Sequence, residues 1–149
     1  MNAIKISNIK KIKAFSLVEL IIAMSIIAIL VGIAYPNYLN YKIRVNRVDM
    51  QAEMQRIAGQ IQQYRAINQN YTGATLQHLG ITAIYPNSGT AYFDLNLSAT
   101  AQGWTLSAIP KADSMQQNNG ALVLNNLGQN CWVEGQICQP NATTTWNKR

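Results

Sequence analysis

Residues 13–36 of this chain read KAFSLVELIIAMSIIAILVGIAYP, and this stretch decides how the rest is organised. Between Phe15 and Tyr35 it holds a single charged side chain, that of Glu19. As an α-helix, these 21 residues would extend about 32 Å at roughly 1.5 Å per residue, close to the roughly 30 Å of hydrocarbon in a bilayer. The stretch therefore predicts a hydrophobic membrane-spanning helix over residues 15–36.

The positive charge of the chain is concentrated ahead of this helix. The 149 residues carry a net charge of +6, from 12 basic and six acidic side chains. Four of the basic residues precede Ala14, so the remaining eight basic and six acidic residues leave only +2; the four are Lys5, Lys10, Lys11 and Lys13. Basic residues beside an apolar helix stay on the cytoplasmic side of a membrane. The charge therefore predicts topology, with a cytoplasmic N-terminus, rather than an affinity for nucleic acid.

Composition and the residues after the helix limit the class of protein. A secretory signal has a shorter apolar core and an Ala-x-Ala cleavage site, whereas Pro36, Tyr38 and Tyr41 follow this stretch. The pattern favours a retained helix, and composition alone leaves a simple one-pass anchor open. A disordered chain is excluded because 48% of the residues are hydrophobic, and a large α/β barrel is excluded by length.

Glu19 is difficult to reconcile with a simple anchor. A carboxylate within a spanning helix costs about 2.5 to 3.5 kcal/mol on insertion scales and is usually kept for a function. No cation lies between Phe15 and Lys42, so its partner must be another molecule, a headgroup or a newly created amino terminus. A lysine-rich leader followed by Phe15-Ser16-Leu17-Val18-Glu19-Leu20 and an apolar helix resembles the class III signal of type IV pilins and type II secretion pseudopilins.

That resemblance implies a maturation route. A prepilin peptidase on the cytoplasmic side would remove the basic leader, residues 1–14, by cutting between Ala14 and Phe15, and would methylate the new amine of Phe15. Glu19 would be the assembly glutamate, paired with the amine of an adjacent subunit. The family usually has glycine before the cut, so Ala14 departs from its pattern. The chain would be a single-pass inner-membrane protein before assembly and part of an extracellular pilus afterwards.

Helical periodicity continues beyond the apolar stretch, over residues 37–67. Charged side chains occupy the other faces of this helix. Its apolar stripe consists of Ile43, Met50, Met54, Ile57, Ile61 and Tyr64. We expect this amphipathic half to pack against a sheet. Gly32 and Pro36 weaken the helical ladder between the two halves and predict a bend. The resemblance makes them a candidate place for local melting.

The C-terminal half predicts a β-sheet. Residues 68–89 are rich in Asn, Gln, Thr, Gly and Pro and match the αβ-loop of the family in position. Strand-like runs follow at residues 90–98, 104–109, 121–125 and 131–133, with turn residues that favour antiparallel hairpins. The expected fold is α+β: a long N-terminal helix packed on a C-terminal antiparallel sheet over residues 90–134, as in pilins. The globular domain would comprise residues 37–149.

Two cysteines, Cys131 and Cys138, lie in the half expected to leave the cytoplasm, where a disulfide is the simplest interpretation. The pair resembles the C-terminal disulfide-bounded loop of the family. Residues 103–110 and 120–132 resemble PilE-like minor pilins of type IVa systems. The residues from Gln139 onward are expected to be poorly anchored.

The sequence predicts no enzyme, cofactor or metal site. The chain has one histidine, His78, and lacks the Gly-x-Ser-x-Gly and Gly-x-x-x-x-Gly-Lys motifs of hydrolases and nucleotide-binding loops. A zinc site would need more ligands than the two cysteines supply. Direct contact with nucleic acid is disfavoured, because the basic residues after Arg65 are only Lys111, Lys148 and Arg149.

We therefore expect a structural subunit of a type IV pilus, most like a minor pilin, which in this family supports motility, adhesion or DNA uptake. The expected partners are the major pilin, other minor pilins, the prepilin peptidase and an inner-membrane assembly platform with a separate ATPase. Two alternatives stay open: a type II secretion pseudopilin, and a membrane-anchored receptor pilin that binds DNA or another ligand.

Overall fold

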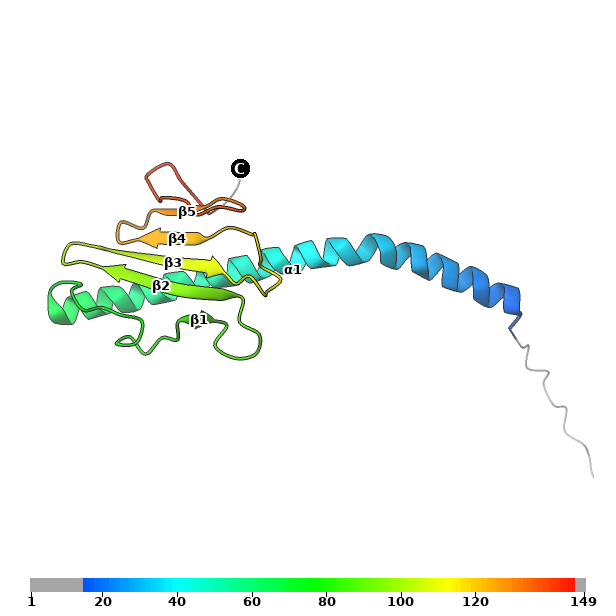
Figure 1. Cartoon of the computed structure of the whole chain (residues 1–149), viewed down its shortest axis with the longest axis horizontal. Helices are drawn as coiled ribbons and strands as arrows, with labels where there is room; N and C mark the ends of the chain where they lie inside the picture. Colours follow the sequence, from blue (N-terminus) through cyan, green and yellow to red (C-terminus); the bar gives the residue numbers. More distant parts are fainter. Residues whose placement is uncertain (1–14, 147–149) are drawn as a thin grey trace, which may run out of the picture. The chain divides into compact units, whose positions relative to one another are not determined.

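The computed structural model describes residues 15–146 and contains, over that range, one helix and one sheet. The helix is α1 (Leu17–Asn68), and the strands are β1 (Ile84–Tyr85), β2 (Phe93–Ala99), β3 (Trp104–Pro110), β4 (Leu122–Asn125) and β5 (Asn130–Trp132). The strands pair in the order β1-β2-β3-β4-β5, and each pair is antiparallel (Figure 1). The expected α+β fold is confirmed. The leader, including Ala14, lies outside the described residues.

The chain divides into two compact units, one ending at Leu39 and the other beginning at Asn40. In the first unit every residue from 15 to 38 is exposed, and the helix there is long and apolar enough to cross a membrane. Helix α1 is continuous through Gly32 and Pro36. The bend and the local melting expected at these two residues stay predictions.

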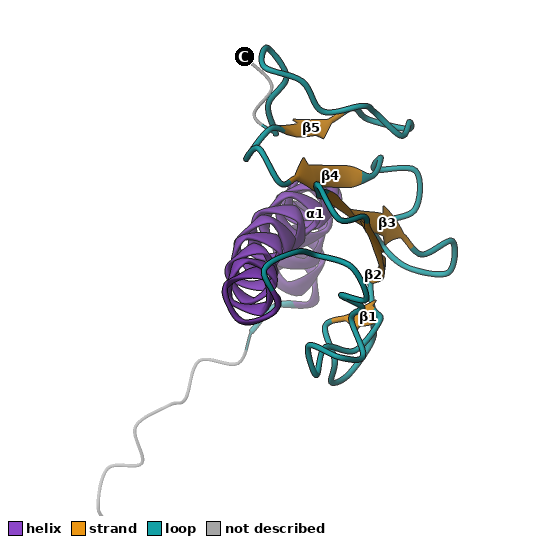
Figure 2. Cartoon of the chain, turned by 90° about the vertical axis from the view of Figure 1, so that its left-hand side faces the viewer, coloured by secondary structure: helices purple, strands orange, loops and turns teal. Residues whose placement is uncertain are grey.

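The core of the second unit lies between α1 and one face of the sheet, whose other face carries no helix (Figure 2). Four side chains of the predicted apolar stripe are fully buried: Met50, Met54, Ile57 and Ile61. Ile43 and Tyr64, at the two ends of the stripe, are half-buried. The sheet contributes Phe93, Leu95, Leu106, Ala108, Leu122, Leu124 and Trp132 to the same cluster. The amphipathic half of α1 therefore packs as its periodicity predicts.

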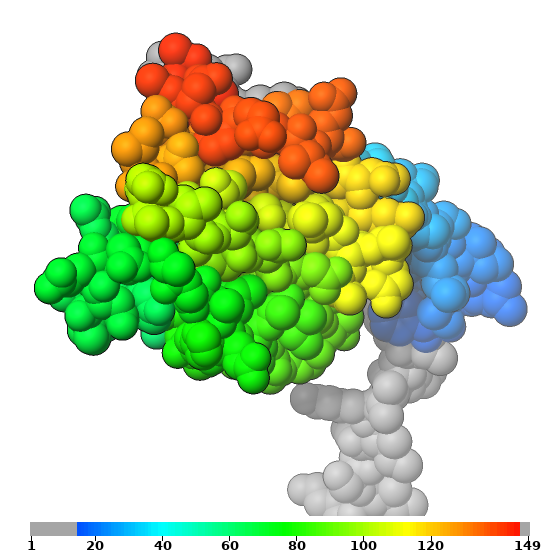
Figure 3. All heavy atoms as spheres, turned by 60° about the vertical axis from the view of Figure 1, so that its left-hand side comes forward, coloured from blue at the N-terminus to red at the C-terminus, as the bar shows by residue number. Residues whose placement is uncertain are grey.

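The edge strand β1 lies inside residues 68–89, the segment that matches the αβ-loop of the family in position. Its two residues pair with β2, with Tyr85 opposite Phe93. The Tyr85 hydroxyl also donates a hydrogen bond to Asp49 Oδ2 on α1, at 2.7 Å. Two residues are too few for an alternating apolar pattern, so this strand has no signal in the sequence. In the space-filling view the green loop containing β1 flanks one side of the sheet, and the orange to red C-terminal segment flanks the other (Figure 3).

The C-terminal segment is anchored at two points. Cys131 and Cys138 form a disulfide with their Cα atoms 6.1 Å apart. Trp146 is buried, its backbone amide donates to Asn130 Oδ1 at 2.9 Å, and its indole Nε1 donates to the Val123 carbonyl at 3.2 Å. The expectation that residues from Gln139 onward are poorly anchored was therefore wrong as far as Trp146, because a single aromatic side chain holds the segment on the sheet.

Gly120, which precedes β4, should be the most sensitive glycine of the sheet. Its φ is +82°, and a Cβ at this position would overlap the carbonyl oxygen of Val133. Gly128 has a φ of +74° and open space around it. We expect Gly128→Ala to lower the free energy of unfolding by about 1–2 kcal/mol through backbone strain alone, and Gly120→Ala to lower it by about 1–3 kcal/mol more through overpacking.

Urea unfolding of the full chain in detergent micelles would measure both effects. Gly128→Ala serves as the matched control, because it carries the same left-handed backbone without the clash. Equal losses for the two variants would show that the contact between Gly120 and Val133 contributes nothing.

The contact between Tyr85 and Asp49 should make stability depend on alkaline pH. Burial, and then the hydrogen bond to Asp49, raises the pKa of Tyr85 to about 12, above the roughly 10 of an unfolded chain. Its contribution to the free energy of unfolding is therefore complete below about pH 10 and is lost as the pH rises through 10 towards 12. Urea unfolding between about pH 8 and 11.5 should show a steeper loss for the wild type than for Tyr85→Phe. Tyr41→Phe, at an exposed tyrosine, should keep the wild-type slope, and parallel slopes for all three chains would contradict the assignment.

Candidate functional site

The first candidate site is the beginning of α1. Phe15 is 77% exposed, and Glu19 lies in the first turn of the helix. Glu19 Oε2 accepts a hydrogen bond from the backbone amide of Ser16 at 3.4 Å. Ser16 and Glu19 thus have the spacing of a capping box, in which the glutamate reaches back to the residue that precedes the helix. The role predicted for Glu19 did not include this cap, although its Ser-x-x-Glu signal is present in the sequence.

The Glu19 carboxylate keeps most of its bonding capacity. Its hydrogen bond to Ser16 is long, and a carboxylate can accept several hydrogen bonds. Over residues 15–146 the structure contains no ion pair to Glu19. A negative charge in the first turn is also favoured by the helix dipole. The beginning of α1 can therefore present an anionic acceptor to a cation from outside the chain.

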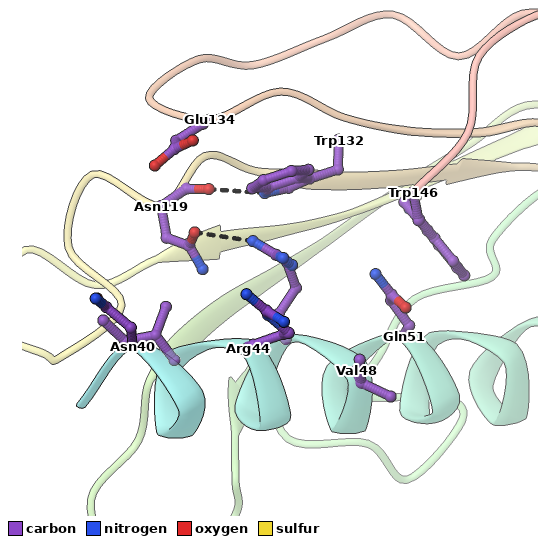
Figure 4. Close-up of a pocket in the computed structure, with 10 residues that line it drawn as sticks. Asn40, Arg44, Val48, Gln51, Asn119, Trp132, Glu134 and Trp146 are labelled. Carbon is purple, nitrogen blue, oxygen red and sulfur yellow. Dashed lines mark hydrogen bonds between the residues drawn. The ribbon is translucent and has the colours of Figure 1, made fainter. Parts of the chain in front are cut away.

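The second candidate site is a groove of about 800 Å³ in the second unit, between α1 and the C-terminal part of the sheet (Figure 4). One wall is a polar ridge on α1, which we define as Asn40, Arg44, Arg47 and Gln51. These positions are separated by four, three and four residues, so they share one face of the helix. The opposite wall consists of Asn119, Trp132, Glu134 and Trp146.

Arg47 connects the two walls of the groove. Its guanidinium carbon lies 3.7 Å from the centroid of the Trp132 ring, and Nη1 donates a hydrogen bond to Asn119 Oδ1 at 3.1 Å. The Trp132 indole donates to the Asn119 carbonyl at 2.7 Å. Stacking on an aromatic face and hydrogen bonding to an amide both suit a planar guanidinium. Arg47 is therefore held in one orientation between helix and sheet.

The loop between β3 and β4 contacts α1 beside the groove. Gln116 is fully buried; its Nε2 donates to the Ile43 carbonyl on α1 at 3.0 Å, and its Oε1 accepts from Asn119 Nδ2 at 2.6 Å. Asn46 Nδ2 on α1 lies 3.1 Å from the sulfur of Met115 in the same loop. The two contacts to α1 join residues that are far apart in sequence, so the groove exists only in the folded chain.

The residues that line the groove carry a small net positive charge. Burial lowers the pKa of Arg47, the charge of Arg44 lowers it further, and the charge of Glu134 raises it. An arginine titrates so far above neutrality that it stays protonated despite such a shift. With two guanidinium groups and one carboxylate in its lining, the groove has a net charge of +1. It is suited to an anionic ligand that also accepts hydrogen bonds.

The other residues singled out from the sequence lie apart from the groove. His78 is in the loop before β1, with Nδ1 2.7 Å from the Gly73 carbonyl oxygen. Lys111 makes an ion pair with Asp94 at 3.4 Å, and Trp104 is buried in the core. Lys148 and Arg149 lie outside the described residues. Within the described part of the chain, no group of three or more metal-ligating side chains occurs.

Comparison with known families gives two matches. Residues 36–123, more than half of the chain, match the family described as type IV minor pilin ComP, DNA uptake sequence receptor. Residues 9–35 match the prokaryotic N-terminal methylation motif. No curated protein matches the chain.

Proposed function

Because this chain belongs to the family of type IV minor pilins described as DNA uptake sequence receptors, we propose that it assembles into a pilus and there binds DNA for uptake. The match to the methylation motif supports the assembly step, and the match over the globular unit supports the receptor step. A type II secretion pseudopilin is less well supported, because the family that matches residues 36–123 is one of minor pilins.

The apolar surface of α1 is the observation that carries the assembly proposal. Every residue from 15 to 38 is exposed, and most of these side chains are large and hydrophobic. Such a surface is unfavourable in water by about 25 cal/mol per Å², so it must stay in lipid or be covered by other helices. Extraction from the membrane and polymerisation are therefore one coupled step. The ATPase that drives this step is a separate protein of the assembly platform.

Glu19 directs that step in our proposal. A prepilin peptidase removes residues 1–14 at the Ala14–Phe15 bond and methylates the amine of Phe15. That ammonium group then pairs with Glu19 of an adjacent subunit. In a low-dielectric environment the attraction between two such charges is many times larger than in water. The carboxylate that is costly in lipid thereby becomes a favourable contact in the filament.

Glu19→Ala should leave membrane insertion intact and remove the chain from filaments. Membrane fractionation and immunoblots of sheared filaments from cells carrying the variant would measure both, and the expected loss from filaments is at least tenfold. Ser25→Ala is a matched control, because Ser25 is a second exposed polar side chain on this helix and its hydroxyl donates to the Ile21 carbonyl at 2.7 Å. Mass spectrometry of the incorporated chain should find a methylated Phe15 at its N-terminus. Filaments that contain Glu19→Ala at the wild-type level would overturn the proposal.

The receptor proposal predicts salt-dependent binding of double-stranded DNA by the globular unit. The leader lysines would bind DNA on their own, so the test uses the full chain with these residues changed to Gln: Lys5, Lys10, Lys11 and Lys13. Fluorescence anisotropy with a labelled duplex should show binding at about 50 mM salt that weakens as salt rises, because phosphate contacts release counterions. The control is the same duplex with empty micelles. No binding at about 50 mM salt would overturn the receptor function and leave the assembly proposal standing.

A further inference from the structure

We infer that the polar ridge of α1, together with the groove that it borders, binds the phosphate backbone of double-stranded DNA. The inference rests on the proposed receptor function and adds the surface that would perform it. The ridge is the row of Asn40, Arg44, Arg47 and Gln51 defined above, and every one of these side chains carries N–H donors.

Arg44 is the central residue of this inference. It is exposed, and within the part of the chain that the structure describes its guanidinium has no hydrogen bond or ion pair. The other described arginines are engaged: Arg47 with Asn119, Arg56 with Glu53 at 2.6 Å, and Arg65 with the Tyr71 hydroxyl at 3.2 Å. Arg44 is therefore the arginine whose five donors are available for a phosphate.

The ridge is long enough and rigid enough to contact several phosphates of one DNA strand. Eleven helical positions separate Asn40 from Gln51, which corresponds to about 16 Å at 1.5 Å per residue and to roughly five nucleotides of one strand. Arg47 is already fixed by Trp132 and Asn119, so its donors lose little conformational freedom on binding. The side-chain amides of Asn40 and Gln51 have no hydrogen-bond partner among residues 15–146 and can extend the row of contacts.

The distribution of charge selects the side of the groove that the phosphates occupy. Arg44 lies on the α1 wall, whereas the guanidinium of Arg47 reaches from α1 to Trp132 on the opposite wall. Glu134, the carboxylate of the lining, also lies on the opposite wall (Figure 4), so a polyanion is attracted to the α1 wall through Arg44. Charge complementarity therefore places the backbone along α1. An acidic segment of a neighbouring pilin would match the same charges, and the experiment is designed to separate it from DNA.

The test compares two pairs of substitutions in the full chain with neutralised leader lysines. Arg44→Gln removes a cation from the ridge, and Arg65→Gln removes one from the same helix more than five turns away. Gln51→Glu adds an anion to the ridge, and Gln63→Glu adds one at an exposed position outside the groove. Anisotropy titrations of a labelled duplex at several salt concentrations give the affinity and its salt slope for each chain, and circular dichroism confirms that each variant is folded.

We expect Arg44→Gln to lower the salt slope by about 1 and the affinity about eightfold at 0.1 M salt, the effect of one lost phosphate contact. Gln51→Glu should weaken binding at least as much, and Arg65→Gln and Gln63→Glu should stay within about twofold of the wild type. If the wild type binds DNA and all four variants bind equally well, the inference is overturned and the receptor function survives. If the ridge variants bind DNA normally but fail to enter filaments, the groove holds a neighbouring pilin instead, which also overturns it.

Discussion

A helix that cannot be left in water is the constraint on which this molecule depends. From residue 15 to residue 38 the chain exposes an apolar surface interrupted by one carboxylate, that of Glu19. The core of the second unit begins only at Met50 and includes no residue of this stretch. Such a surface is stable only in lipid or against other apolar surfaces. The capping contact between Glu19 and the Ser16 amide orients the carboxylate at the helix end without neutralising it.

The second half of α1 has one face that packs in the core and another that carries the polar ridge. Met50, Met54, Ile57 and Ile61 bury one face against the sheet, which fixes the position of the helix in the globular unit. The polar ridge occupies another face, and its member Arg47 reaches across to the sheet. Because the core holds the helix rigidly, the ridge needs few contacts of its own to keep its geometry. The buried Gln116, which bonds to the Ile43 carbonyl, supports the helix at the end where the core stops.

Most of the fold could be predicted from the sequence because the helix and the two longest strands have local periods, whereas β1 is too short to have one. The sequence alone shows the apolar stripe of the helix, the alternation of apolar residues in β2 and β3, and the turn residues between strands. The groove could not be predicted in this way. Arg44 and Arg47 read as solvated charges on the outside of a helix, since the side chains that face them, Asn119 and Trp132, lie more than seventy residues further along the chain. The anchoring of Trp146 was missed for the same reason, because its hydrogen bonds go to Asn130 and Val123.

Net charge is a poor guide to the affinity of this protein for DNA. The leader lysines dominate the total of +6, and a chain that begins at Phe15 has only +2. A ridge with two arginines can release about two counterions, which corresponds to weak binding by a single subunit at physiological salt. In the proposed filament that result would change, because several copies of the chain on one fibre would contact one duplex together. Linked sites of modest strength can exceed the affinity of each by about 10² to 10⁴ when their spacing permits simultaneous contact. Recognition through the polar ridge would then depend on assembly through α1, because only assembly brings several ridges onto one fibre.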